Sequence, residues 1–293
     1  MQENLNSNFV KAIRFMLLST MSFAIMNILI KYLIDYSTFQ LVFFRSLGSL
    51  IITFLILKTK KVYLWGNQKK LLIFRALSGV IAMCFFYWGA HYISIGSAVT
   101  IRYVSPIFAA ILATIFLSEI IKPFQWLFFL ISFIGVFLIR NFDPSGSNMG
   151  IIIVLVASFF SAVVYILISK IGKGDNSYVI VFYFMLFATC IGGVGSFFSW
   201  KTPSISDYIL LISLGIFGFF GQLFMTRAFQ NEEVHLIAPF KYIEIVFTLI
   251  IGFTIIDEKY SVLHLLGAFL VIFGLLLNIF YREKNLKKTK KLF

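Results

Sequence analysis

Two charged residues lie inside an apolar stretch near the C-terminal end of the chain. Residues 233–254 read EVHLIAPFKYIEIVFTLIIGFT, with Lys241 and Glu244 well inside the run. A charge at the centre of a membrane helix costs about 2.5–3.5 kcal/mol even on lenient insertion scales. The two side chains are three residues apart, so they share a helix face and can neutralise each other. They are expected to face the protein interior or a wet cavity, either as a packing ion pair or as part of a binding site.

Arg102 is a third charge of this kind, and its own apolar run holds no carboxylate before Glu119. Counted from the expected helix ends, Arg102 lies about 10 Å from one membrane face and Lys241 about 12 Å from the other. In a hydrocarbon core about 30 Å thick, the two cations would lie about 8 Å apart along the normal. A small organic molecule has that size, so a carboxylate or phosphate held by both cations is the binding-site interpretation.

Polar residues at similar depth either line the same cavity or serve packing. These residues are Asn27, Tyr87, His91, Tyr165 and Gln222. Aromatic faces attract cations, so the tyrosines would suit a ring or an onium group. Pro106 and Pro239 lie in the runs that carry Arg102 and Lys241, and proline permits a bend there. Arg45 fits either a structural role or a place in an outer vestibule.

The composition is that of an integral membrane protein. Of 293 residues, 60% are hydrophobic and 13% are charged, and the mean hydropathy is +0.95; a soluble domain carries about 25% charged residues. Apolar runs of about 17–25 residues predict membrane helices. Ten such runs predict an all-α protein with spans near 12–32, 38–57, 71–91, 95–117, 123–140, 148–170, 178–199, 207–229, 233–255 and 261–281. The first run lacks a cleavage site and is expected to be retained, and Cys84 and Cys190 form no disulfide or metal motif.

Basic residues predict how the chain crosses the membrane. The net charge of +13 comes largely from the segment between Lys58 and Arg75 and from the tail REKNLKKTKKLF. Both flank apolar runs, which is typical of cytoplasmic loops and does not indicate nucleic-acid binding. The loop charges therefore predict a multi-pass protein of the cytoplasmic membrane with both termini in the cytoplasm.

The sequence matches itself without gaps at an offset of 139 residues. The matched pairs are Ser19 with Ser158, Ser22 with Ser161, Lys31 with Lys170, Arg102 with Lys241, Tyr103 with Tyr242, Glu119 with Glu258, Gly135 with Gly274, and the stripe Ala76, Gly79, Ala82 with Gly215, Gly218, Gly221. The pattern predicts a first five-helix repeat at 1–145, a second at 146–282 and a basic cytoplasmic tail at 283–293. Because five is odd, the second repeat should be inverted. Inverted repeats recur in secondary transporters, with a substrate site near mid-membrane. Glu119 and Glu258, at opposite faces, are expected to cap or latch closed vestibules and not to bind substrate.

Two long stretches resemble the EamA-type, ten-helix branch of the drug/metabolite transporter superfamily. They are RYVSPIFAAILATIFLSEIIKPFQWLFFLISFIGVFLI and APFKYIEIVFTLIIGFTIIDEKYSVLHLLGAFLVIFGLLL. Within that branch, APFKYIEIVF is similar to S-adenosylmethionine carriers. The resemblance implies alternating access around a central cavity, with Asn27, Tyr87, Arg102, Tyr103, Tyr165, Gln222, Lys241 and Glu244 in or near it; Tyr242, the repeat partner of Tyr103, completes the predicted substrate-binding set. The first span lacks the carboxylate that the superfamily's four-helix drug exporters use.

These observations predict a secondary transporter for a small polar metabolite, anionic or zwitterionic, such as S-adenosylmethionine or an amino acid. The alternative is a membrane scaffold or a lipid flippase. No G-x-x-x-x-G-K-[ST] loop is present, so energy would come from gradients or exchange. His91, His235 and His264 are scattered, which argues against an enzyme. No cofactor is expected, the partners are the substrate and the bilayer, and a monomer is compatible with the sequence.

Overall fold

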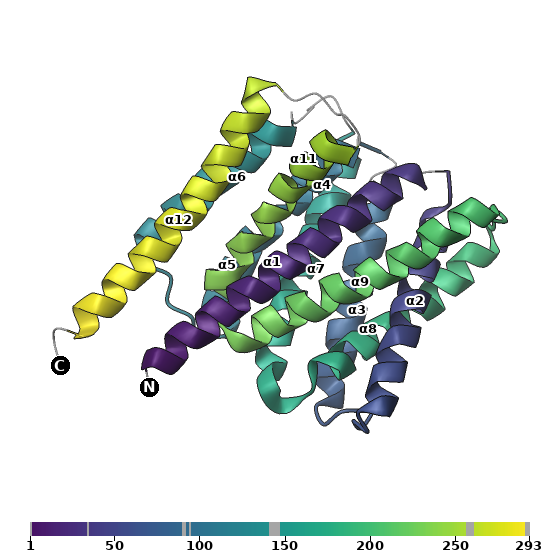
Figure 1. Ribbon diagram of the computed structural model, residues 1–293, viewed down its shortest axis with the longest axis horizontal. Coiled ribbons are helices and arrows are strands. Elements are labelled where there is room, and N and C mark those ends of the chain that lie inside the picture. The colour runs from purple at the N-terminus through teal and green to yellow at the C-terminus, as the bar shows by residue number, and fades with distance from the viewer. Residues whose placement is uncertain are drawn as a thin grey trace.

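A computed structural model describes residues 2–33, 35–89, 92–93, 95–140, 147–255 and 261–290, which form helices and no strand. The helices of the first half are α1 (Gln2–Tyr32), α2 (Thr38–Thr59), α3 (Lys69–Gly89), α4 (Ile95–Arg102), α5 (Ser105–Phe116) and α6 (Pro123–Arg140). Those of the second half are α7 (Asn148–Ile171), η1 (Gly172–Gly174), α8 (Ser177–Phe197), α9 (Ile205–Asn231), α10 (Val234–Ile237), η2 (Ala238–Tyr242), α11 (Ile243–Ile255) and α12 (Val262–Lys290). Figure 1 shows them as a bundle.

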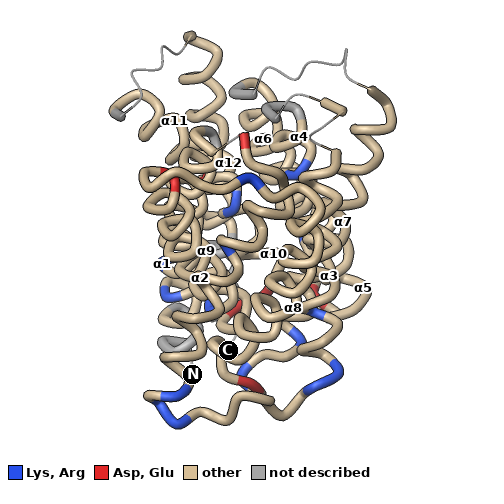
Figure 2. The backbone as a smooth tube through the Cα atoms, turned by 90° about the vertical axis from the view of Figure 1, so that its right-hand side faces the viewer, with Lys and Arg blue, Asp and Glu red and all other residues tan. Residues whose placement is uncertain are grey.

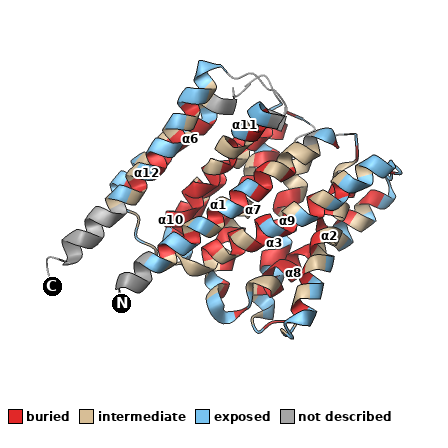
Figure 3. Ribbon diagram, viewed as in Figure 1, coloured by how far each residue is buried: buried red, intermediate tan, exposed pale blue. Residues whose placement is uncertain are grey.

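The helices account for the expected membrane spans. Nine stretches of the described chain are long and apolar enough to cross a bilayer, and the shorter apolar helix Pro123–Leu138 provides a tenth candidate. Buried residues lie where helices face one another (Figure 3). Many large apolar residues, such as Phe197 and Phe269, are exposed. An apolar outer surface suits contact with lipid. The all-α membrane fold predicted from the sequence is therefore confirmed.

The helices pair in a way that respects the 139-residue offset. Helix α1 packs along α9, and their counterparts α7 and α3 pack along each other. Helix α2 packs on its own counterpart α8, and α6 packs on its counterpart α12. In Figure 1, α6 and α12 run side by side at one edge of the bundle. Exchanging the two halves thus maps each major helix contact onto another.

Individual close contacts obey the same exchange. A Cβ added at Gly135 would lie 2.7 Å from the backbone nitrogen of Val271, and one at Gly274 would lie 2.9 Å from that of Ser132. Ser132 and Val271 are themselves 139 residues apart. Small residues at these positions let α6 and α12 approach closely, as helices in membranes commonly do. The contacts follow a two-fold relation between the halves; their opposite orientation across a membrane stays a prediction.

Two spans that were predicted to be continuous are broken in the structure. Helix α4 ends at Arg102 and α5 begins at Ser105, next to Pro106. In the other half, the span divides into α10, η2 and α11, and Lys241 lies in the 3₁₀ turn η2, which also contains Pro239. Proline removes a backbone donor, which explains the breaks. The freed backbone near Arg102 is partly satisfied by Ser158 of α7, whose hydroxyl donates to the Ile101 carbonyl at 3.0 Å.

One end of the bundle carries most of the described basic residues, and we call it the basic end (Figure 2). The connection between α2 and α3 lies at this end, with Lys58, Lys60, Lys61, Lys69 and Lys70 in or beside it, and the described outer ends of α1 and α12 lie toward it. The prediction that Arg75 belongs to this loop cluster is wrong. Arg75 is 1% exposed and lies six residues into α3, about 9 Å along the helix. The predicted roles of His91 and Glu258, the side chain of Lys31 and the side chains of the basic tail lie outside the described residues.

Candidate functional site

Glu244 is the centre of the buried polar contacts between the two halves. Its side chain is 1% exposed. One carboxylate oxygen, Oε1, accepts hydrogen bonds from Asn27 Nδ2 at 2.8 Å and from Arg102 Nη2 at 3.2 Å. The other oxygen, Oε2, accepts from Lys241 Nζ at 2.7 Å. Three predicted site residues from α1, α4 and η2 therefore converge on a single carboxylate.

This convergence adds a partner for Arg102 that the sequence did not indicate. The sequence offered no carboxylate for Arg102 within its own span, but Glu244 of the other half is its partner. Arg102 and Lys241 were also expected to stand about 8 Å apart with space between them. Both instead contact the same carboxylate, because each lies where its helix is interrupted and the chain can turn inward. The space expected between the cations is occupied by Glu244.

Aromatic rings cover the two cations on their other sides. The guanidinium carbon of Arg102 lies 4.5 Å from the centroid of Phe86, and Lys241 Nζ lies 4.4 Å from that of Phe23. Such cation–π contacts strengthen when water is excluded. The group of Arg102, Lys241 and Glu244 still carries one net positive charge. It is therefore suited to receive an anionic group.

Four tyrosines of the predicted set surround this centre. Tyr103 and Tyr242, the repeat partners, meet edge to face with ring centroids 6.0 Å apart. Tyr87, Tyr103 and Tyr165 all lie within electrostatic range of Arg102. The hydroxyl of Tyr242 is buried and has no hydrogen-bond partner among the described residues. Because Tyr103 and Tyr242 match at the 139-residue offset and contact each other, the two-fold relation between the halves passes close to this site.

Gln222 is the member of the predicted set that the structure places elsewhere. Its side-chain oxygen accepts a hydrogen bond at 2.8 Å from Nη2 of the buried Arg75. The Arg75 guanidinium also stacks on Phe184, 4.4 Å from its centroid. Arg75 was not among the predicted site residues, because it lies close to a run of loop lysines. Its position inside the helix, one turn before the small residue Gly79, was the available signal.

A polar pocket of about 620 Å³ opens at the basic end between the halves. Residues 117–120 line it from the first half and residues 229–233 from the second. Phe229, in its wall, stacks on Tyr165 with centroids 4.6 Å apart. The pocket thus adjoins one of the tyrosines of the central group.

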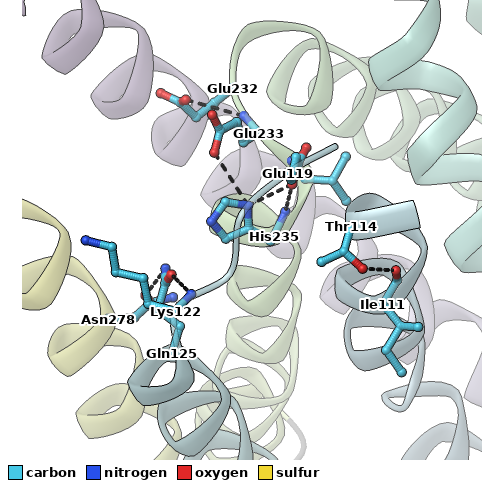
Figure 4. Close-up of polar contacts among 10 residues, drawn as sticks. Ile111, Thr114, Glu119, Lys122, Gln125, Glu232, Glu233, His235 and Asn278 are labelled. Carbon is cyan, nitrogen blue, oxygen red and sulfur yellow. Dashed lines mark hydrogen bonds and ion pairs between the residues drawn. The ribbon is translucent and has the colours of Figure 1, made fainter. Parts of the chain in front are cut away.

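Glu119 joins the two halves beside this pocket (Figure 4). Its carboxylate accepts the backbone N–H groups of Val234 at 2.7 Å and of His235 at 2.9 Å, which caps the first turn of α10. The same carboxylate contacts His235 Nδ1 at 2.7 Å, and Glu233 approaches that nitrogen at 3.5 Å. Glu119 thus caps a helix and contacts the other half, while its predicted role in closing a vestibule stays a prediction. Glu119, Glu233 and His235 are also the one group among the described residues with spacing compatible with a metal ion.

Known proteins resemble the chain over nearly its whole length. The pseudopaline exporter CntI of Pseudomonas aeruginosa is 27% identical over 87% of this chain and 91% of its own. An uncharacterized transporter of Helicobacter pylori is 30% identical over 93% of this chain and 96% of its own. The S-adenosylmethionine uptake transporter of Rickettsia prowazekii is 25% identical over 96% of both chains. A solved crystal structure shares the fold, with a TM-score of 0.80 at 11% identity over 92% of this chain and 95% of its own.

The sequence profile of the EamA-like transporter family matches residues 10–141 and again residues 148–280. The two matches coincide with the two sets of helices that exchange under the two-fold relation. The resemblance noted in the sequence is thereby confirmed, and the relatives with assigned activities are named as transporters or exporters. By its two repeats, its apolar helices and its relatives, the chain belongs to the EamA-like transporter family.

Proposed function

We propose that the protein is a secondary transporter that moves a small zwitterionic or anionic metabolite by alternating access. The observation that carries the proposal is the buried contact of Glu244 with both Arg102 and Lys241. A substrate carboxylate bound between the halves would make the same contacts with Arg102 and Lys241 that Glu244 makes. In the absence of substrate, Glu244 takes that place.

Binding then becomes an exchange of partners. A substrate carboxylate that enters between Arg102 and Lys241 displaces Glu244 from one of them, and Glu244 turns to the ammonium or sulfonium group of the same molecule. The tyrosines offer ring faces to that cationic group. Arg102, Lys241 and Glu244 each keep a partner of opposite charge throughout the exchange, which lowers its free-energy cost in the low-dielectric interior. This chemistry favours amino acids and S-adenosylmethionine over simple carboxylates or amines.

The two halves can move because the site lies where their helices are broken. Arg102 belongs to the first half, and Lys241 and Glu244 belong to the second. Interrupted helices at the midplane are a recurring feature of transporters whose repeats rock against each other. At the basic end, the Glu119 cap on α10 closes one contact between the halves, and the polar pocket beside it supplies an entrance.

Relatives support this class of cargo without fixing the substrate or the direction. One relative is named an exporter of pseudopaline and another an uptake transporter of S-adenosylmethionine. The same scaffold therefore serves both directions in different proteins. For this chain we propose the cytoplasmic membrane, with the basic end and both termini inside. A cysteine placed in the tail should resist an impermeant thiol reagent in intact cells, and its reaction would contradict this orientation.

Substrate pairs that differ in a single group test the proposal. Purified protein is melted in detergent with S-adenosylmethionine, with amino acids and, as matched controls, with amines that lack the carboxylate. The same compounds are then followed into proteoliposomes. We expect saturable stabilisation by at least one carboxylated compound, no response to its amine, and uptake of the stabilising compound. Lipid scrambling with no soluble ligand would favour a flippase instead.

A further inference from the structure

Arg75 is a buried cation that has no anionic partner among its described contacts. Its residue is 1% exposed, and of its guanidinium nitrogens only Nη2 has an acceptor, the Gln222 side chain. Nε and Nη1 are buried without a hydrogen-bond partner. An ionised side chain left without a counter-charge in the interior is strongly disfavoured. An arginine stays charged in proteins, so it cannot escape this cost by losing its proton.

The surroundings of Arg75 add positive charge. Arg45 is 8% exposed and its recorded partners are the sulfur of Met83 at 3.6 Å and the ring of Phe23 at 5.9 Å. Arg45 lies against Gly218 and Arg75 bonds to Gln222, two positions one turn apart on α9. Lys241 contacts the same Phe23 ring as Arg45, with its Nζ 4.4 Å from the ring centroid. The three cations are thus connected, because Arg45 and Lys241 contact the same Phe23 ring and Arg45 and Arg75 contact successive turns of α9.

The carboxylates of the interior do not balance this series. Among the described residues of the spans, Glu244 faces Arg102 and Lys241 and no other arginine. Asp175, also buried, is occupied at the basic end, where it accepts the backbone N–H groups of Asn67 and Gln68. The interior described here therefore holds more positive charge than one substrate carboxylate would neutralise.

The partners that Arg75 does have both belong to the other half. Arg75 lies in α3 of the first half, whereas Phe184 and Gln222 lie in α8 and α9 of the second. When the halves separate, as the proposed transport cycle requires, the Arg75 guanidinium loses its contacts with the Phe184 ring and with the Gln222 amide at the same time. An oxyanion is the ligand that would then satisfy its donors.

We infer that Arg75 is a second anion-binding group of the transport path, one that receives a carboxylate or a phosphate when the halves separate. The inference rests on the movement of the halves in the proposed function, but not on the amino group of the substrate. The oxyanion is either a second acidic group of the substrate or a free inorganic anion. Gln222 and Phe184 hold the place of that oxyanion in the state described here.

Inorganic phosphate is the probe for this site. Full-length protein in detergent is melted at increasing phosphate with ionic strength held by sodium chloride, as wild type and as Arg75→Gln. Arg227→Gln is the matched control, because Arg227 has the same charge but contacts Tyr178 and Phe15 at the end of α9. We expect saturable stabilisation of wild type and of R227Q, and at least about a tenfold higher half-saturating phosphate concentration for R75Q.

Stability without phosphate separates binding from packing. If Arg75 binds an anion, R75Q should melt no lower than wild type in the absence of phosphate, because it removes an unpaired charge. A lower melting temperature together with an unchanged phosphate response would overturn the inference, and so would a wild type that does not respond. Arg75→Lys keeps the positive charge and should keep a weaker stabilisation by phosphate. If phosphate stabilises it no better than R75Q while both variants fold, the charge at position 75 does not bind the anion.

A second arm identifies the source of the oxyanion. Phosphate that competes with uptake of the transported compound in proteoliposomes assigns Arg75 to an acidic group of the substrate. Phosphate that leaves uptake unchanged or stimulates it assigns the site to a free anion. The phosphate melting experiment needs no transported compound. It can therefore still test the role of Arg75 if the proposal of an amino-acid substrate fails.

Discussion

The two halves of the molecule agree in packing and differ in charge. Gly135 and Gly274 make equivalent close approaches, and Tyr103 meets its own counterpart Tyr242. The acidic residue at the centre has no such counterpart, because the position that matches Glu244 is Ser105. A duplicated scaffold needs its matched small residues in both copies to keep the helices together. Charges that occur in one copy are not required by the scaffold, and this separates residues that build the fold from residues that act in it.

The same contrast appears around Arg75 and His235. The counterpart of Arg75 is Leu214, that of Arg45 is Phe184, and that of His235 is Gly96. Phe184 is the ring on which Arg75 stacks, so an aromatic residue of one half receives a cation of the other. A transporter with fully matched halves would present the same surface to both sides of the membrane. In the proposed transporter, unmatched charges would let the two ends differ in what they bind.

Removing the central carboxylate should have the largest effect. Glu244→Gln leaves Arg102 and Lys241 without their shared partner, and breaking a buried ion pair costs about 3–5 kcal/mol. We expect a large drop in the melting temperature in detergent and loss of uptake into proteoliposomes.

The double variant Lys241→Met with Glu244→Gln is its control. It removes one charge of each sign, so much of the lost stability should return while uptake stays absent. Wild-type uptake by a stable double variant would show that Lys241 and Glu244 only pack, and would leave Arg102 as the intramembrane ligand.

Moving the carboxylate to the other half tests the two-fold relation directly. Ser105→Glu combined with Glu244→Ser places the acid three residues after Arg102, as Glu244 stands three residues after Lys241. By symmetry the new carboxylate should reach both cations and recover roughly half of the 3–5 kcal/mol lost without Glu244. Thermal unfolding beside the single variant Glu244→Ser measures the recovery. No gain in stability would mean that the halves differ in backbone as well as in charge.

The acidic caps should have a smaller effect, on rate more than on binding. Glu119→Ala removes the cap of α10, for which about 0.5–2 kcal/mol is typical. We expect faster amide hydrogen exchange at 234–237, altered uptake rates, and equilibrium binding within a few-fold of wild type.

Glu258→Gln is the counterpart test at the other end, because Glu258 matches Glu119 at the 139-residue offset. Binding of the transported compound should survive this change as well. If Glu258→Gln abolished equilibrium binding while the protein stayed folded, Glu258 would be a substrate ligand and the latch assignment would be wrong.

Much of the architecture is legible in the sequence because bilayer thickness fixes the length of each helix. The ten spans and the inward placement of Arg102, Lys241 and Glu244 follow from apolar runs and one internal offset, and the family follows from the resemblance of two long stretches. The partner of Arg102 does not, because it lies 142 residues away in the other half. Contacts between the repeats depend on how the two halves pack against each other, and this packing cannot be predicted from a single sequence.

Arg75 shows a second limit. The five lysines that precede it between Lys58 and Lys70 made it resemble a topology signal, and only the start of α3 at Lys69 places it inside the bundle. Helix ends are uncertain by a few residues in any sequence analysis. An error of that size moves an arginine from water to the membrane interior and changes its meaning completely. Phe23 and Phe86 escaped notice for a different reason, because a phenylalanine among many gives no signal that it faces a cation.

The smallest expected effect comes from a matched pair of serines, and it separates scaffold from site most finely. Ser19 donates to the Gly221 carbonyl of α9 at 2.8 Å, and its counterpart Ser158 donates to the Ile101 carbonyl at the break beside Arg102. Hydrogen bonds between membrane helices average about 0.6 kcal/mol, so Ser19→Ala and Ser158→Ala should lower stability by similar small amounts. Their effects on transport should differ. Ser19 supports two continuous helices, whereas Ser158 supports the turn that directs Arg102 toward Glu244. We therefore expect Ser158→Ala to weaken substrate binding and Ser19→Ala to leave it unchanged, measured by ligand-induced melting shifts on both variants. Equal binding by the two would mean that Pro106 and the packing around it hold the break without help from α7.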